Sequence, residues 1–212
     1  MLITFEGIEG SGKSTQARLL YEWFINKGYE CILTREPGAT RIGKILRRIL
    51  LVPHNEAITK EAELFLYLAD RSQHIENVIR PALNEKKIVI VDRFIDSTIA
   101  YQGYGRGLHI DFLEKLNSVV LKGLRPDITF LLDIDPEKGL RRVEERNKKD
   151  DSSKKEVRFE KEEILFHRKV REGYLELSER FKDRIVALDG SEGIDMIFEK
   201  VVFIIQRRFG WC

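Results

Sequence analysis

Short apolar runs recur along the chain, and stretches of helical periodicity separate them. The runs lie at Leu2–Phe5, Glu30–Thr34, Ile88–Val91, Ile128–Leu132 and Ile185–Leu188. Four of them are largely apolar, which is typical of strands in a sheet that is covered on both faces. We therefore predict five buried β-strands.

Between these runs, apolar residues recur as they do on one face of an amphipathic helix. The predicted helices are Lys13–Lys27, Glu61–Asn84, Asp111–Lys122, Pro136–Arg146, Lys161–Phe181 and Ile194–Arg208. Strands that alternate with helices form right-handed crossovers and a parallel sheet. The pattern predicts an α/β protein with three layers, α/β/α, around a five-stranded parallel sheet. Ligands of such sheets bind beyond the carboxyl ends of the strands.

The segment Arg146–Lys155 interrupts this alternation, because it has no apolar residue and no periodicity. We expect an exposed loop between two helices, which is either a solvated surface loop or a moving lid. No other break in composition divides the 212 residues. The expectation is therefore a single domain over residues 1–212, with a lid at about 146–158 as a subregion.

Composition narrows the classes of function. The chain carries 37 Lys and Arg against 35 Asp and Glu, which argues against a nucleic-acid binder that works through overall charge. Cys31 and Cys212 lie far apart and have no metal-ligand spacing, so we expect a cytoplasmic protein. The first predicted strand begins at once and no apolar run reaches about 18 residues, so neither a signal peptide nor a membrane span is expected.

The first predicted strand leads into the segment Gly7-Ile8-Glu9-Gly10-Ser11-Gly12-Lys13-Ser14, which fits the phosphate-binding pattern G-x-x-x-x-G-K-[ST]. Glycines let successive backbone N–H groups point into one concavity at a helix N-terminus. In such a loop Lys13 reaches the β- and γ-phosphates, and the Ser14 hydroxyl holds Mg²⁺. We expect ATP to be bound by Gly7, Ile8, Glu9, Gly10, Ser11, Gly12, Lys13, Ser14 and Thr15.

Two further groups follow predicted strands. Asp92 and Arg93 come after the third strand, where the carboxylate can hold the water shell of Mg²⁺ and the guanidinium can bind a phosphate. The alternative is an Asp–Arg pair that only caps the next helix. After the second strand, the turn Thr34-Arg35-Glu36-Pro37-Gly38 is rigid and would aim Arg35 at an anion.

Tyr67 and Arg71 lie four residues apart on the long predicted helix. This spacing puts an aromatic ring and a planar cation on the same side. A nucleobase can stack on such a ring and bind such a cation. An intrahelical cation–π pair is the alternative, and the spacing alone favours it.

Taken together, these segments resemble the bacterial thymidylate kinase (dTMP kinase) family of P-loop nucleoside monophosphate kinases. The matching motifs are Phe5 to Thr15, Thr34 to Gly38, Tyr67 to Arg71, Asp92-Arg93-Phe94, Asp96-Ser97-Thr98, Ala100-Tyr101-Gln102-Gly103, Arg125-Pro126-Asp127, Leu131-Leu132-Asp133, Arg158-Phe159-Glu160, and Phe166-His167 through Tyr174. The P-loop is shared by unrelated enzymes, but its combination with Thr-Arg-Glu-Pro-Gly, Asp-Arg-Phe and Ala-Tyr-Gln-Gly is far more specific. The resemblance covers nearly the whole chain. It implies a P-loop kinase fold with a mobile lid, and transfer of the ATP γ-phosphoryl group to dTMP.

The resemblance also implies roles for individual residues. Lys13, Arg93 and Arg158 would be catalytic, with Arg158 supplied from the lid because the P-loop has no arginine. The residues that would bind dTMP are Glu9, Arg35, Pro37, Arg47, Tyr67, Arg71, Arg93, Ser97, Thr98, Tyr101 and Gln102. Among them, Tyr67 would stack on thymine, Arg71 would bind the base edge and Tyr101 would crowd the sugar.

The implied cofactor is Mg²⁺, held by Ser14 and Asp92 and bound together with ATP. The implied partners are the small molecules ATP and dTMP and a second copy of the chain, with no nucleic acid and no membrane. Neighbouring Arg146, Lys154 and Lys155 would add a diffuse positive field.

Three other functions stay open. The first is a kinase of the same fold that acts on another nucleoside or nucleotide. The second is a regulatory GTPase, because Asn147-Lys148-Lys149-Asp150 matches the guanine-binding pattern N-K-x-D, although it lies in a charge run and no D-x-x-G motif accompanies it. The third is a nucleotide-binding module without activity, which the intact Gly12-Lys13-Ser14 argues against.

Overall fold

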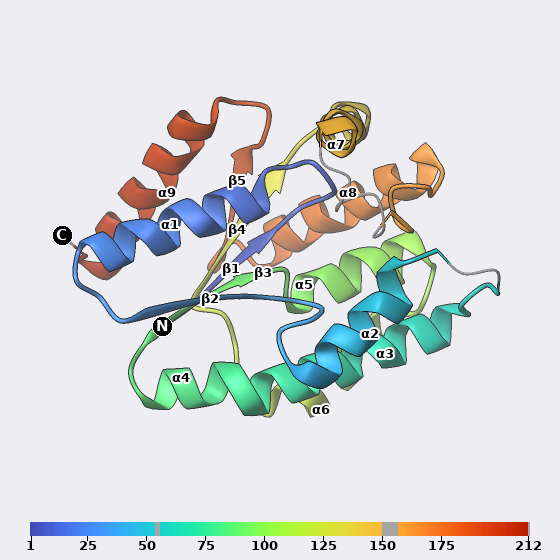
Figure 1. The fold of residues 1–212 in the computed structure, drawn as a ribbon, viewed down its shortest axis with the longest axis horizontal. Helices are drawn as coiled ribbons and strands as arrows, with labels where there is room; N and C mark the ends of the chain where they lie inside the picture. Colours follow the sequence, from blue (N-terminus) through green and yellow to red (C-terminus); the bar gives the residue numbers. More distant parts are fainter. Residues whose placement is uncertain (54–55, 150–156, 212) are drawn as a thin grey trace.

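A five-stranded parallel sheet forms the centre of the computed structural model, which describes residues 1–53, 56–149 and 157–211 (Figure 1). The strands are β1 (Leu2–Glu6), β2 (Cys31–Arg35), β3 (Ile88–Asp92), β4 (Ile128–Asp133) and β5 (Ile185–Asp189). Their order is β2-β3-β1-β4-β5, and all four pairings are parallel. The prediction of five parallel strands is confirmed.

Each strand ends one residue later than predicted, on a polar residue. The final residues are Glu6, Arg35, Asp92, Asp133 and Asp189. Backbone pairing continues past the apolar run, because the ladder depends on N–H and C=O groups rather than on side chains. A row of charged side chains therefore marks the carboxyl edge of the sheet.

Helices cover both faces of the sheet (Figure 1). They are α1 (Lys13–Asn26), α2 (Arg41–Leu51), α3 (Lys60–His74), α4 (Arg80–Asn84), α5 (Ile95–Thr98), α6 (Ile110–Leu121), α7 (Pro136–Lys149), α8 (Ile164–Arg180) and α9 (Ile194–Phe209). A π-helical turn η1 (Ile75–Ile79) joins α3 to α4, and η2 (Ile99–Gly105) continues α5. The long predicted helix is thus continuous but contains a π-helical segment.

Side chains that point alternately to the two faces of the sheet allow helices to pack on both, which gives the three layers. Ile3 and Phe5 of β1 pack with α1 and α9, whereas Leu2 packs on the opposite face with η1. Because successive side chains of a strand point to opposite faces, each apolar strand contributes to two cores. The predicted three-layer architecture is confirmed.

Two helical segments were not predicted, namely α2 and the α5–η2 pair. On α2, Ile42 and Ile45 are 53% and 63% exposed whereas Leu50 is fully buried, so its apolar positions do not mark one buried face. Its start does carry a local signal, because the Thr40 hydroxyl accepts a hydrogen bond from Gly43 N at 2.9 Å and caps the helix.

The prediction of a loop at 146–155 is wrong for its first residues, because α7 continues to Lys149. Asn147 Nδ2 donates to Glu160 Oε2 at 2.9 Å, which ties the end of α7 to the segment before α8. The rest of the predicted lid up to residue 156 lies outside the described residues. Within the described part of the chain, no helix combines the length and apolar character needed to cross a bilayer.

Candidate active site

The P-loop (residues 7–14) carries the chain from β1 into α1. Gly7, Gly10 and Gly12 have φ angles of 138°, 71° and 99°, which side-chain-bearing residues rarely adopt. Gly10 also lies against Gly139, where a Cβ atom would come within 2.0 Å of the carbonyl oxygen. Lys13 Nζ donates to the carbonyl of Ile8 at 2.9 Å and folds over the loop. The loop therefore has the backbone of an anion nest with an ammonium group beside it.

Lys13 is held in an environment that weakens its charge. Burial lowers the pKa of Lys13 to about 8, and the charge of Arg93 acts in the same direction, although Asp92 and Glu9 oppose it. An anion bound beside Lys13 would raise that pKa again. The site thus favours a polyanion, which supplies the missing negative charge.

Ser14 and Asp92 lie side by side, and the Ser14 hydroxyl donates to Asp92 Oδ2. The pairing of Phe5 with Asp92 in the sheet brings the end of β3 next to the P-loop. A hydroxyl and a carboxylate, completed by phosphate and water oxygens, are the ligands that Mg²⁺ prefers. These two side chains therefore fit a Mg²⁺ ion that arrives with a nucleotide. The described residues contain no group of three or more His, Cys, Asp or Glu side chains that could hold a metal.

Arg93 lies at the border of the P-loop. Its Nη1 donates to Gly7 O at 2.9 Å and to Tyr174 Oη at 3.1 Å, while Nη2 donates to Glu9 Oε1 at 3.1 Å. The guanidinium also lies over the ring of Tyr101, 4.8 Å from its centroid. These contacts fix a planar cation beside the concavity of the loop, where it can bind a second phosphate.

Glu9 connects the P-loop with the aromatic residues of the site. It accepts a hydrogen bond from Tyr101 Oη at 2.6 Å, and its Oε2 lies 3.3 Å from His167 Nδ1. Burial alone would raise the pKa of Glu9, but the facing His167 and the charges of Arg93 and Lys13 lower it well below its usual value. Glu9 is therefore an anion that balances the cations around it.

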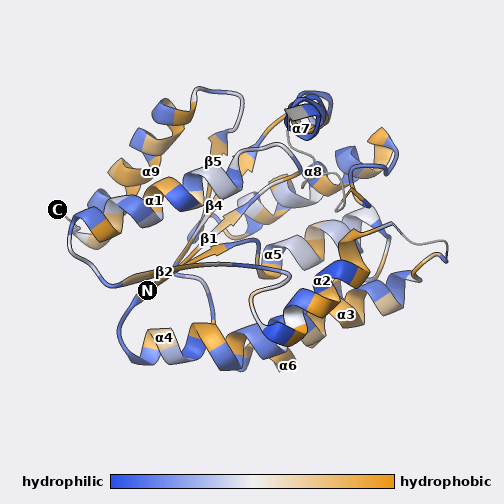
Figure 2. Ribbon diagram, viewed as in Figure 1, coloured by the Kyte–Doolittle hydropathy of each residue, from blue (hydrophilic) through white to orange (hydrophobic). Residues whose placement is uncertain are grey.

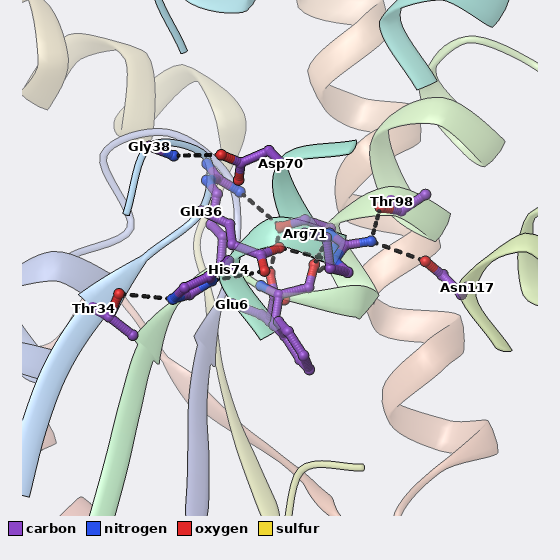
Figure 3. Close-up of polar contacts among 12 residues, drawn as sticks. Glu6, Thr34, Glu36, Gly38, Asp70, Arg71, His74, Thr98 and Asn117 are labelled. Carbon is purple, nitrogen blue, oxygen red and sulfur yellow. Dashed lines mark hydrogen bonds and ion pairs between the residues drawn. The ribbon is translucent and has the colours of Figure 1, made fainter. Parts of the chain in front are cut away.

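Arg71 on α3 is almost completely buried, at 1% exposure, and Figure 3 shows it among its partners. Nε donates to Glu36 at 2.8 Å, Nη1 to Thr98 and Asn117 at 2.6 and 2.9 Å, and Nη2 to Phe94 O at 2.8 Å. The guanidinium lies over the ring of Phe94, 5.6 Å from its centroid. Within the described residues it makes no cation–π contact with Tyr67, so the alternative favoured by spacing is not the observed one.

The turn after β2 is held by the same helix (Figure 3). Glu36 Oε1 lies 2.9 Å from His74 Nδ1, and His74 Nε2 lies 2.8 Å from Thr34 Oγ1. Asp70 Oδ1 accepts from Gly38 N at 3.0 Å. Asp70, Arg71 and His74 of α3 therefore form hydrogen bonds at both ends of the turn that carries Arg35.

These groups line one cavity of about 200 Å³. Its lining contains the predicted site residues Glu9, Gly10, Lys13, Ser14, Arg35, Pro37, Arg47, Tyr67, Arg71, Asp92, Arg93, Ser97, Thr98, Tyr101 and Gln102. We call the part formed by Gly10, Lys13, Ser14 and Asp92 the P-loop side, and the part formed by Tyr67, Arg71, Thr98 and Gln102 the α3 side. Gly7, Ile8, Ser11, Gly12 and Thr15 belong to the loop and its helix but do not line the cavity.

Arg158 lies apart from the other predicted residues. It does not line the cavity; its Nη1 donates to Leu50 O at 2.9 Å and its Nη2 donates to the Glu63 carboxylate. Arg146, by contrast, does line the cavity, and its side chain is 59% exposed with Nη2 3.4 Å from Glu160. The structure thus places a different arginine on the cavity than the one implied by the resemblance.

Several lining residues were not predicted from the sequence. They are Glu36, Leu51, Phe94, Val143, Arg146, Phe159 and Glu160. Glu36, Phe94, Phe159 and Glu160 lie inside the recognised motifs, so their positions were available as a signal. Leu51 and Val143 are apolar residues of α2 and α7, and helical spacing alone does not distinguish a cavity residue from a core residue.

Known proteins resemble the chain along nearly its whole length. The thymidylate kinase family model matches residues 5–201. Thymidylate kinase of Oleidesulfovibrio alaskensis is 53% identical over 201 residues, which are 95% of each chain. The enzyme of the same name from Maridesulfovibrio salexigens is 52% identical and covers 98% of this chain and 96% of its own. The crystal structure of thymidylate kinase from Ehrlichia chaffeensis matches with a TM-score of 0.78 at 34% identity, covering 97% of this chain and 98% of that one.

Proposed function

The chain belongs to the thymidylate kinase family of ATP-dependent nucleotide kinases, and we propose that it transfers the γ-phosphoryl group of ATP to dTMP, giving ADP and dTDP. One observation carries this proposal. A single cavity joins an anion-binding P-loop to a pocket of aromatic and arginine side chains, and Arg93 stands between them. Two phosphorylated substrates can therefore meet end to end.

ATP is proposed to bind on the P-loop side. The backbone N–H groups of residues 7–14 and the Lys13 ammonium would hold its phosphates. Ser14 and Asp92 would hold Mg²⁺, which neutralises phosphate charge when bound. The adenine is assigned to the turn after β5, because Arg142 Nη1 donates to Gly190 O at 2.8 Å and this turn lies against Ser11.

The nucleotide dTMP is proposed to bind on the α3 side. The ring of Tyr67 would stack on thymine, and Tyr101 would crowd the sugar and disfavour a ribose. Four N–H groups of Arg71 have protein partners, which leaves one N–H of Nη2 without a partner among the described residues. That N–H would donate to O4 of the base.

Charge neutralisation is the main task of the residues around the reacting phosphates. The acceptor phosphate has a second pKa of about 6, so at neutral pH it is a nucleophile that needs no general base. Arg93, Arg35 and Arg47 would bind it and hold it in line. For the cation that closes over the transferring group, the resemblance implies Arg158, whereas the cavity lining, which contains Arg146 and not Arg158, favours Arg146.

A second copy of the chain is the proposed protein partner, in a cytoplasmic enzyme. Ile42 and Ile45 on α2 and Phe65 on α3 are each more than half exposed, and apolar residues are visible on both helices in Figure 2. Helices α2 and α3 pack against each other, so these side chains belong to one region. The mass of the protein in solution, measured by light scattering, tests this.

A coupled assay of ADP release tests the proposed reaction. With ATP, dTMP should be the best of four acceptors, dUMP roughly ten- to two-hundred-fold poorer for lack of one methyl group, UMP poorer still, and thymidine inert. Turnover of another nucleotide in preference to dTMP would assign the other acceptor. ADP release with none of them would favour a binding module without activity.

A further inference from the structure

Glu63 on α3 is a fully buried carboxylate with three partners. Its Oε1 accepts from Gln102 Nε2 at 2.9 Å and from Arg106 Nε at 3.2 Å, and its Oε2 accepts from Arg106 Nη2 at 3.1 Å and from Arg158. Guanidinium groups only donate, so both oxygens of Glu63 act as acceptors.

This carboxylate decides which way the amide of Gln102 is turned. A glutamine amide has a donating end and an accepting end, and a free amide can present either one. Only Nε2 can face a carboxylate oxygen, so Oε1 is the end left over. Gln102 lines the cavity, and its Oε1 has no hydrogen-bond partner among the described residues. The group that Gln102 offers to a ligand is therefore an acceptor.

We propose that Glu63 is a positioning residue that sets the base preference of the α3 side by fixing Gln102 as a hydrogen-bond acceptor. This inference rests on the proposed function, because it requires a pyrimidine monophosphate in the cavity. Thymine and uracil carry a carbonyl oxygen, O4, next to a donating N3–H. Cytosine carries an amino group next to an accepting N3.

The donor of Arg71 and the acceptor of Gln102 match the edge of thymine or uracil and do not match the edge of cytosine. Arg71 Nη1 donates to Thr98, and Arg71, Thr98 and Gln102 all line the same cavity. A cytosine would bring donor to donor and acceptor to acceptor, which leaves buried polar groups unpaired. With its amide reversed, Gln102 would instead donate to N3 of cytosine, and the discrimination would weaken.

The Glu63→Gln variant removes this constraint, because a glutamine at 63 can accept from Gln102 or donate to it. The arginines around it keep other partners, since Arg106 Nη2 also donates to Glu162 at 2.6 Å and Arg158 also donates to Leu50 O. We expect the ratio of kcat/KM for dTMP over dCMP to fall by about ten-fold or more. The ratio for dTMP over dUMP should not change, because both bases have the same edge.

Two matched variants serve as controls. Glu63→Asp keeps a group that only accepts, so it should keep the preference for dTMP over dCMP even where the overall rate falls. Arg106→Met removes another partner of Glu63 without touching Gln102, so it should lower the melting temperature and leave the ratio unchanged.

Two results would overturn the proposal. The first is a Glu63→Gln enzyme that phosphorylates dTMP with the wild-type ratio over dCMP. The second is an equal loss for dTMP, dUMP and dCMP, which would indicate a merely structural role. Failure of the proposed function looks different, because the wild-type enzyme itself would then not phosphorylate dTMP.

A measurement on the wild-type protein covers the case in which Glu63→Gln does not fold. The side-chain amide of Gln102, assigned in ¹⁵N spectra by its absence from Gln102→Met, should exchange its hydrogens slowly with and without dTMP. Fast exchange in both states would show that Glu63 does not hold it.

Discussion

The P-loop side and the α3 side of the cavity hold their polar groups in different ways. On the α3 side, Arg71 donates four hydrogen bonds within the protein and is 1% exposed. On the P-loop side Ser14 is exposed, and Arg146, which lines the same cavity, has one long contact, with Glu160, among the described residues. One side is thus assembled before a substrate arrives, and the other is completed by its ligand.

This difference suits the two proposed substrates. A base must be distinguished from its relatives, which requires donors and acceptors in fixed positions. A triphosphate needs charge and a flexible closure instead, because its γ-phosphoryl group moves during the reaction. Residues of the α3 side consequently support the fold as well as the function, whereas those of the P-loop side serve mainly the function.

The largest expected effects come from Lys13→Ala and Arg93→Ala, which should each lower kcat by about 10²- to 10³-fold. Their effects on stability should differ. Loss of Arg93 leaves the Glu9 carboxylate without the cation that is hydrogen-bonded to it, which we expect to lower the free energy of unfolding by about 3 kcal/mol. Loss of Lys13 should cost little, because burial already disfavours its charge. Steady-state kinetics and urea unfolding of both variants measure these effects.

Wild-type turnover in either variant would remove that residue from its proposed role. Equal stability losses in the two variants would show that the P-loop side is as firmly built as the rest of the site. Lys13→Met is the matched control, because it keeps the length of the side chain and lacks the charge.

Arg146→Ala and Arg158→Ala should have smaller effects, the first mainly on kcat and the second mainly on stability. Arg146 lines the cavity and is loosely held, so its loss should lower kcat by about ten- to a hundred-fold with an unchanged melting temperature. Arg158 is bound to the buried Glu63, so its loss should mainly lower stability. The kcat and the melting temperature, measured for both variants, show which arginine acts in catalysis and which stabilises the fold.

The sequence-based assignment of Arg158 would prevail under one outcome. Arg158→Ala would then lower kcat more than it weakens ATP binding, with the stability of the wild type, while Arg146→Ala would be nearly neutral. Such a result would require Arg158 to leave Glu63 when both substrates are bound.

Sequence patterns predicted the parts of this structure that depend on local signals. Apolar runs located all five strands, and the glycine spacing of residues 7–14 located the P-loop. The spacing of Tyr67 and Arg71 put both on one side of a helix, and both line the cavity, but the spacing alone favoured a cation–π pair and did not predict that Arg71 is buried. Four partners from 23 to 46 residues away bury it, and spacing along one helix carries no information on such contacts.

The contacts of Glu63 also could not be predicted from spacing along one helix. It lies in the first turns of α3, where an acidic residue is ordinary. Its partners Gln102, Arg106 and Arg158 lie 39, 43 and 95 residues further along the chain. The helix α2 was not predicted because its apolar residues mix buried and exposed positions: Leu50 is fully buried, whereas Ile42 and Ile45 are more than half exposed. That residues 1–212 form one domain with a moving lid stays a prediction.

The smallest expected effect concerns the carboxylate of Asp70, a buried residue of α3 next to the α3 side. Its Oδ1 accepts from Gly38, but its Oδ2 is buried and has no partner among the described residues. Burial raises the pKa of Asp70 to about 6, and the nearby charge of Glu36 acts in the same direction. In the unfolded chain the pKa of an aspartate is about 3.9.

Between these two pKa values the folded protein binds more protons than the unfolded chain, so its stability falls as the pH rises from about 4 to 6. The Asn of Asp70→Asn keeps an acceptor for Gly38 and cannot ionise. We expect this variant to be more stable than the wild type by about 2 kcal/mol at pH 7, and the difference to vanish near pH 4. Urea unfolding at the two pH values measures it, with the exposed Asp195→Asn as a control that should not change with pH in this way. The gain in stability of Asp70→Asn over the wild type could instead be the same at pH 7 and at pH 4. That result would show that Asp70 is not an uncompensated charge beside the turn that carries Arg35.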